Sequence, residues 1–267
     1  MEYNAPARFV RPRKCIGVRI VGLVLALGVG ALLLGCSSFG GDQNTFNPEG
    51  DIAQKQLDIF LIALYPAIVV FFIVGGALVY ALLRYRRRDD TMPEQVHGNM
   101  RLEIVWTVLP TLLLIGLAVP MVAAIIDIGR APGDDALRVD VTGQQFSWFF
   151  EYPDELDKNG KPLRVLDDLR IPVDRDVFAH IESIDVIHSF WVPKLAGKID
   201  AVPGRTNKLK FNATAPGTFS GQCAEFCGLR HAFMKFTVIA CSEDEFSQWV
   251  EQKKSGAEET ACAKEES

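Results

Sequence analysis

Two long runs of uncharged, mostly apolar residues dominate the first half of the chain, at positions 59–83 and 104–126. An α-helix rises about 1.5 Å per residue, so each run is long enough to cross the ~30 Å hydrocarbon core of a bilayer. Prolines inside both runs would break soluble helices but are tolerated in membrane spans. The pattern therefore predicts a hairpin of two transmembrane helices over residues 58–127.

The segment that joins the two runs predicts the orientation of the hairpin. Basic residues gather in and beside this segment, whereas the outer flanks of the runs hold far fewer. The arginines concerned are Arg84, Arg86, Arg87, Arg88 and Arg101. Because arginine-rich loops stay in the cytoplasm, we expect the chain beyond residue 127 to lie on the exterior side of the plasma membrane.

The N-terminal region has the pattern of a secretory leader. Residues 1–15 carry four basic side chains, and residues 16–35 form an apolar run interrupted only by Arg19. The run ends in a Leu-x-Gly-Cys sequence, which resembles a bacterial lipoprotein cleavage box. We expect cleavage before a lipid-bearing Cys36, with an uncleaved membrane helix as the alternative. The polar residues 36–57 are then a linker.

From residue 137 the pattern changes to short stretches that alternate apolar and polar positions. Leu137, Val139 and Val141 share one face at a period of two, and residues 177–182 alternate in the same way. Asn159-Gly160 is a strong signal for a tight turn. Several short strands without intervening helices predict an all-β sandwich or barrel over residues 128–253.

The end of the chain predicts one helix and a tail. Ser242 and Glu245 have the S-x-x-E spacing of a capping box, and an apolar stripe follows on one helix face. Residues 254–267 are small, polar and charged, so we expect them to be disordered. Of the cysteines outside the metal cluster described next, Cys241 reads as a small buried hydrophobe. Cys262, in the polar tail, has no predicted role.

Two thiols, an imidazole and a thioether lie within the fourteen residues 221–234, GQCAEFCGLRHAFM, and another histidine lies upstream in IDVIHSFWVP. Thiolate and thioether ligands select soft metals, copper above all. Two cysteines supply more thiolate than one copper needs. Two coppers bridged by both sulfurs would use every ligand, because each copper would also take one imidazole and one weak ligand. The predicted ligands are His188, Cys223, the Glu225 carbonyl, Cys227, His231 and Met234.

Three other interpretations remain open for this cluster. Cys223 and Cys227 could form a disulfide, which an exported domain permits. The two cysteines and two histidines could hold zinc. Met234 could be an ordinary core residue. Each alternative leaves part of the set without a role, whereas copper ligands in loops at one end of a sandwich describe a cupredoxin-like domain.

The fourteen-residue motif, with the upstream DVIHSF, resembles the binuclear copper motif of subunit II of cytochrome c oxidase, and the likeness covers roughly residues 51–250. The resemblance implies a dicopper centre, CuA, that takes electrons from cytochrome c and passes them to the haems of subunit I. Oxygen is reduced there, on another subunit, and protons are pumped outward. Subunit III is a further expected partner. The resemblance also implies a magnesium ion shared with subunit I through the Glu225 side chain.

The same resemblance gives candidate roles to residues outside the cluster. Glu103, in E-x-x-W-T-x-x-P, matches a glutamate at the mouth of a proton path, although an interfacial anchor is an equal alternative. The family's aromatic strand usually has two tryptophans, the first of which receives the electron. Here that position is Phe146, which leaves Trp148 as the candidate or as a structural residue. Asp185 and Asp200 match acidic positions that would attract a basic cytochrome.

Composition and motif content limit the rival functions. The net charge of −5 argues against nucleic-acid binding. The chain has no C-x-x-C-H motif, so it carries no c-type haem. A membrane-tethered copper chaperone would need an open, exchangeable site, which six ligands disfavour. Quinol oxidase subunits of the family lack the cysteine pair, whereas a nitric oxide reductase subunit stays open without knowledge of the partner.

Overall fold

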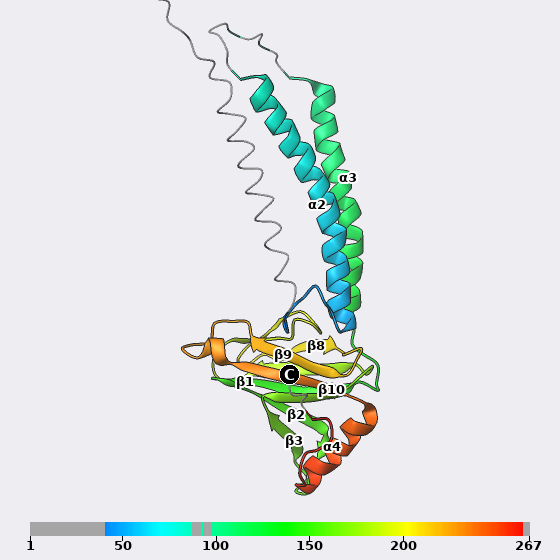
Figure 1. The fold of residues 1–267 in the computed structure, drawn as a ribbon, viewed down its shortest axis with the longest axis vertical. Helices are drawn as coiled ribbons and strands as arrows, with labels where there is room; N and C mark the ends of the chain where they lie inside the picture. The colour runs from blue at the N-terminus through cyan, green and yellow to red at the C-terminus, as the bar shows by residue number, and fades with distance from the viewer. Residues whose placement is uncertain (1–40, 87–91, 93–94, 96–97, 264–267) are drawn as a thin grey trace, which may run out of the picture. The chain divides into compact units, whose positions relative to one another are not determined.

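The computed structural model describes residues 41–86, 92, 95 and 98–263, all but the first of which belong to the compact unit Asp42–Ser267 (Figure 1). The predicted leader and the predicted lipid-bearing Cys36 lie outside the described residues, as does most of the loop between the two apolar runs.

Two long helices, α2 (Asp51–Arg84) and α3 (Met100–Ile128), occupy the two apolar runs. No side chain in the most apolar part of either helix is buried within the chain. A continuous apolar surface of this size is typical of contact with lipid or with partner subunits. Both helices are long and apolar enough to span a membrane, as predicted, and both contain prolines in their interior.

The first helix starts at Asp51, so the predicted linker 36–57 was too long. The N-cap residue, Gly50, has no side chain to bond the first N–H groups. The side chain of Asn212, from the β-domain, does so instead, because its Oδ1 accepts from the Asp51 N–H at 2.9 Å and its Nδ2 donates to the Asp51 carboxylate at 2.9 Å. A Cβ at position 50 would lie 2.4 Å from the Asn212 carbonyl oxygen, so only glycine fits there. This cap is 161 residues distant in sequence, which is why local pattern did not reveal it.

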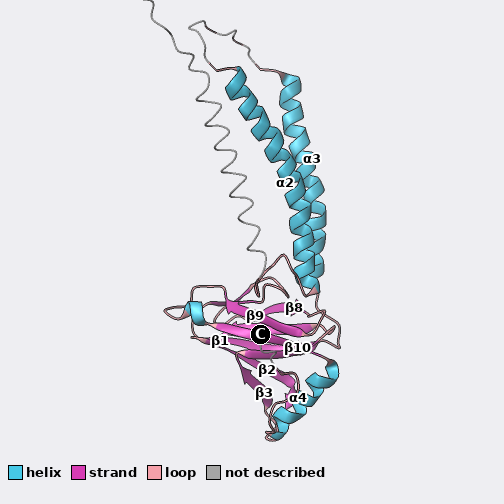
Figure 2. Ribbon diagram, viewed as in Figure 1, coloured by secondary structure: helices cyan, strands magenta, loops and turns pink. Residues whose placement is uncertain are grey.

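The region after α3 is a sandwich of two five-stranded sheets, which confirms the predicted all-β domain (Figure 2). The first sheet has the order β3 (Pro162–Leu166), β2 (Ser147–Leu156), β1 (Leu137–Gln144), β5 (Val177–Ser183), β8 (Asn207–Phe211). The second has the order β4 (Asp168–Pro172), β10 (Lys235–Cys241), β9 (Gly217–Cys223), β6 (His188–Trp191), β7 (Ile199–Ala201). Neighbouring strands are antiparallel except for β1–β5 and β4–β10. The Asn159-Gly160 turn joins β2 to β3, as expected.

The core between the sheets is aromatic near the end that carries the metal cluster. Phe190 stacks on Phe236 with ring centres 4.6 Å apart, and Trp148 packs edge-on against both rings. All three side chains are buried. Rings in this arrangement are rigid and fill the space between the sheets, so they fix the strands from which the cluster residues project.

The last helix, α4 (Glu243–Ser255), confirms the predicted capping box. Ser242 accepts from the Glu245 N–H, and the Glu245 side chain accepts from the Ser242 N–H. The predicted apolar stripe of Phe246, Trp249 and Val250 is buried against the sandwich.

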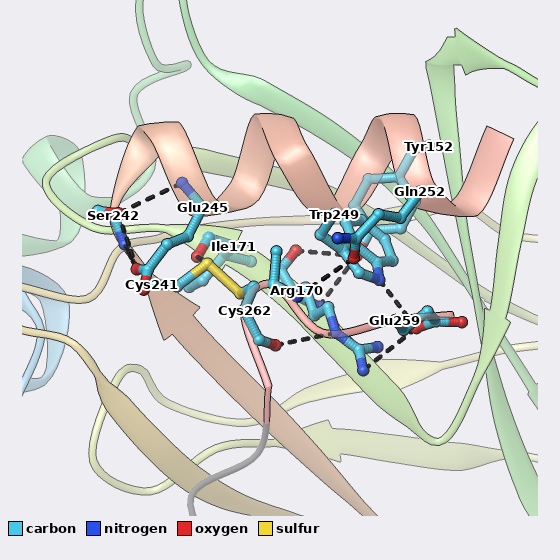
Figure 3. The surroundings of a disulfide bond; sticks show 11 residues. Tyr152, Arg170, Ile171, Cys241, Ser242, Glu245, Trp249, Gln252, Glu259 and Cys262 are labelled. Carbon is cyan, nitrogen blue, oxygen red and sulfur yellow. Dashed lines mark hydrogen bonds and ion pairs between the residues drawn. A yellow bond between two sulfur atoms is a disulfide. The ribbon is translucent and has the colours of Figure 1, made fainter. Parts of the chain in front are cut away.

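The prediction of a disordered tail is wrong for the described residues 254–263, and Cys262, which had no predicted role, has a structural one. After α4 the chain reverses at Gly256 (φ 69°), and residues 256–263, here called the C-terminal strap, pack beside the helix (Figure 3). Cys262 forms a disulfide with Cys241. Disulfides of this kind persist in oxidising compartments, which agrees with an exterior domain.

A charged cluster holds the middle of the strap in place. Glu259 accepts from the indole of Trp249 at 3.0 Å and pairs with Lys253 and with Arg170. The Arg170 side chain also donates to the Cys262 carbonyl at 3.2 Å and lies over the Trp249 ring (Figure 3). Polar residues that looked unstructured in sequence therefore have specific partners.

Candidate metal centre

The cluster lies at one end of the sandwich, where two segments from neighbouring strands meet. His188 is the first residue of β6, and Cys223 is the last residue of β9. Residues 223–234, here called the Cys loop, then lead through a short 3-10 helix, His231–Phe233, to β10. Phe190 of β6 pairs with Cys223 of β9, and this register brings the upstream histidine to the loop.

The six predicted ligand atoms converge, although their residues are spread over 47 positions of the sequence. The two Sγ atoms are 3.9 Å apart. His188 Nδ1 lies 3.9 Å from Cys223 Sγ, and the Glu225 carbonyl oxygen lies 3.2 Å from that sulfur. On the other side, His231 Nδ1 and Met234 Sδ are each 3.7 Å from Cys227 Sγ. Each sulfur therefore has one imidazole and one weak donor beside it.

These separations fit a metal site. Donor atoms that each lie about 2.0–2.3 Å from a shared metal are themselves roughly 3–4 Å apart. Among the described residues, His188, Cys223 and Cys227 form a buried group whose ligand atoms all lie within 4.8 Å of one another. Both thiols are free, so the disulfide alternative is not what the structure contains. The full set, with two sulfurs between two imidazoles and a buried thioether, fits the predicted pair of coppers.

The electrostatics of the two thiols differ in the metal-free chain. Burial opposes ionisation of Cys223, but hydrogen bonds with His188 and the Ser189 backbone lower the pKa of its thiol below the ordinary value. Burial and the adjacent Cys223 thiolate raise the pKa of Cys227 well above that value. The surroundings therefore favour ionisation of Cys223 over ionisation of Cys227. A bound cation would favour ionisation of both sulfurs, because only thiolates are strong ligands.

The His188 ring is held from three sides. Asp185 Oδ1 lies 2.8 Å from Nε2, the nitrogen that faces away from the sulfurs. Trp148 packs edge-on against the ring, and a Cβ at Gly143 would lie 3.0 Å from it, so glycine gives the ring its space. Burial alone would lower the pKa of His188, but its contacts with Cys223 and Asp185 outweigh burial and raise this pKa above the ordinary value. A carboxylate behind a ligating histidine fixes which ring nitrogen faces the metal.

The outer surface of the Cys loop is apolar and exposed. Phe226, Leu229 and Phe233 are 76%, 100% and 74% exposed. The Glu225 side chain is also exposed, while its carbonyl points to Cys223. The loop thus presents donors inward and an uncovered apolar surface outward, which is typical of a protein contact.

The other candidate residues lie elsewhere. Trp148 is completely buried, so it does not touch the surface, and the structural interpretation of this residue is the better one. Glu103 is in the first turn of α3, where its carboxylate accepts from the Asn99 N–H at 3.3 Å. Asp185 and Asp200 are both exposed, but the Asp185 carboxylate also accepts hydrogen bonds from the Gln145 and Val186 N–H groups.

Sequence reasoning missed one participant, Gln145. It lies between β1 and β2, and its side chain donates to the Cys227 carbonyl. A polar residue in a turn gives no signal of its own, so only the fold reveals this contact.

A β-sandwich with soft metal ligands at one end, linked to two helices apolar enough to span a membrane, defines the class of membrane-anchored proteins with a soft-metal site. Two family models match: cytochrome c oxidase subunit II, transmembrane domain, over residues 47–123, and cytochrome c oxidase subunit II, periplasmic domain, over residues 137–241. The chain belongs to the cytochrome c oxidase subunit II family.

The chain is also similar to individual proteins and to solved structures. The chain is 41% identical over 236 residues to cytochrome c oxidase subunit 2 of Alkalihalophilus pseudofirmus, covering 85% of this chain and 66% of that protein. It is 32% identical over 244 residues to quinol oxidase subunit 2 of Bacillus spizizenii, and this match covers 88% of this chain and 73% of that protein. Among solved structures, the periplasmic domain of subunit II of cytochrome oxidase (CoxB) of Bradyrhizobium japonicum is 34% identical, with a TM-score of 0.43, covering 48% of this chain and 100% of that one.

Proposed function

We propose that this chain receives electrons from cytochrome c at a binuclear copper centre and passes them to subunit I of an oxidase that reduces oxygen and pumps protons. The observation that supports this most directly is the donor set: two free thiols 3.9 Å apart, flanked on each side by an imidazole and a weak ligand. When bound, the copper pair stores and transfers a single electron.

The chain's own residues would supply a rigid, dry cage for this centre. His188, Cys223, Cys227 and Met234 are buried, and the aromatic core behind them excludes water. A site whose ligands hardly move between redox states suits electron transfer, because little reorganisation accompanies each step. The thioether of Met234 favours copper over zinc, which takes nitrogen, oxygen and thiolate ligands.

The exposed apolar surface of Phe226, Leu229 and Phe233 supports a protein contact over the centre. The proposal includes a magnesium ion at a boundary with subunit I, which the Glu225 side chain, exposed beside Phe226, would contact. Asp200 is a candidate for attracting a basic cytochrome. In the proposed topology α2 and α3 cross the plasma membrane, so the β-domain with its metal cluster lies outside the cell. Glu103 would take up protons at the opposite, cytoplasmic end of α3.

A test of the function uses the purified complex. Rapid mixing with reduced cytochrome c should oxidise about one haem equivalent per centre in the first phase, and Cys227→Ser should abolish that phase. A quinol serves as the comparison donor, because one relative is named a quinol oxidase subunit. If quinol reduces the complex while cytochrome c does not, the proposed donor is wrong.

A further inference from the structure

Gln145 occupies an exposed turn between β1 and β2, where a glutamine is ordinarily solvated. Here both its backbone and its side chain have specific partners. Its backbone N–H donates to Asp185 Oδ2 at 2.7 Å, and its side-chain amide donates to the Cys227 carbonyl. One residue therefore bonds to both segments that carry the predicted ligands.

These two bonds complete a chain of contacts around the cluster. Asp185 uses its other oxygen, Oδ1, to contact His188 Nε2 at 2.8 Å. The contacts thus run from the His188 imidazole through Asp185 and Gln145 to the backbone of Cys227. His188 is beside one sulfur and Cys227 carries the other, so Gln145 connects the two halves of the site.

The packing at Gly228 shows how closely the turn is pressed against the Cys loop. Gly228 has φ +130°, a region that L side chains rarely adopt. A Cβ there would also lie 2.9 Å from Gln145 Nε2 and 3.4 Å from the Phe146 ring. The Cys227–Gly228 peptide is therefore set against the turn, with the Gln145 amide as its hydrogen-bond donor.

We propose that Gln145 is a positioning residue, which holds the Cys227 sulfur in register with the His188 half of the copper site. This inference rests on the proposed function. Cys227 Sγ is adjacent to both His231 and Met234, so a rotation of its peptide would move one sulfur relative to two other ligands. Contacts behind the ligands typically change metal affinity by about 10–100-fold when they are removed.

The chain offers a matched control in the neighbouring glutamine. Gln144 is also exposed and is the last residue of β1, and its side chain makes no hydrogen bond within the described part of the chain. Gln145→Ala removes the donor, and Gln145→Glu keeps the shape but places a carboxylate against the Cys227 carbonyl. Gln144→Ala tests whether any change in this turn has the same effect.

The test uses the full chain in detergent, with and without copper. We expect Gln145→Ala to lose copper to a chelator about 10–100-fold faster than the unsubstituted chain, with an altered copper hyperfine pattern, and Gln145→Glu to lose it at least as fast. In the metal-free chain, amide hydrogen exchange across residues 224–234 should accelerate in both variants. Gln144→Ala should match the unsubstituted chain in all three measurements.

An unchanged hyperfine pattern and chelation rate in both Gln145 variants would overturn the proposal, even if their thermal stability fell, because that result assigns Gln145 a structural role only. Equal changes in Gln144→Ala would overturn it as well. If the unsubstituted chain itself binds no copper pair, the proposed function fails, and the exchange measurement on the metal-free chain still decides whether Gln145 holds the loop.

Discussion

The disulfide between Cys241 and Cys262 gives a prediction whose size follows from the structure. Cys262→Ser removes a bond that closes a loop with a sequence separation of 21 residues. In the chain-entropy model, a loop of this length restricts the unfolded chain by about 3 kcal/mol at 25 °C. Glu259 and Arg170 also hold the C-terminal strap through ion pairs and hydrogen bonds, so we expect the domain of Cys262→Ser to keep its fold.

We expect the free energy of unfolding of the exterior fragment, residues 130–267, to fall by about 3 kcal/mol in Cys262→Ser. For a domain of this size the midpoint of thermal unfolding should fall by about 10 °C. The measurement is guanidinium unfolding of the metal-free fragment, followed by circular dichroism. A reductant should lower the stability of the unsubstituted fragment by the same amount and leave the variant unchanged.

The matched control is Ala263→Ser, at the exposed neighbouring position. It should lower the free energy of unfolding by less than about 0.5 kcal/mol. The reasoning fails if both Cys262→Ser and the reduced fragment lie within 1 kcal/mol of the oxidised, unsubstituted one. In that case the disulfide is not what fastens the C-terminal strap in solution.

Three further substitutions test other parts of the structure. Phe190→Ala should destabilise the fragment by about 3–5 kcal/mol in denaturant unfolding, because it leaves a cavity in the aromatic core; a loss below 1 kcal/mol would contradict the packing. In the full chain, Asn212→Ala should accelerate amide exchange at the start of α2 and lower the stability of that helix end by about 1 kcal/mol. Unchanged exchange at the Asp51 amide would refute the cap. Burial would raise the pKa of Glu259, but Lys253 and other partners outweigh it and lower this pKa below its ordinary 4.5. The stabilisation that the Glu259 carboxylate gives is therefore present above pH 4.5 and is lost as the pH falls through the lowered pKa. Glu259→Gln should weaken this acid dependence of the unfolding midpoint, and a pH profile identical to that of the unsubstituted fragment would refute the prediction.

The elements that local pattern determines were predictable from the sequence. The two apolar runs, the alternation of β1 and β5, the Asn159-Gly160 turn and the Ser242 capping box each depend on residues close together in the chain. The ligand set was recognisable for a similar reason, because four of its side chains lie in one short segment whose chemistry is unusual.

Features that depend on distant contacts were not predictable. The start of α2 is set by Asn212, far along the chain, and the apolar pattern alone placed it later. Cys262 pairs with Cys241 because the chain reverses at Gly256 and the C-terminal strap returns it to the end of β10, which no spacing indicated. Trp148 was a candidate for contact with an electron donor, but the register of β2 directs its ring into the core. Gln145 was overlooked because its partners come from two other loops.

The central claim is that two sulfurs hold two copper ions, and electron paramagnetic resonance with metal analysis tests it most directly. Full-length chain supplied with copper should contain two coppers per chain and show one unpaired electron coupled equally to both nuclei. Cys227→Ser should lose this pattern. A single copper with a mononuclear pattern, or a colourless chain that binds one zinc ion, would contradict the account.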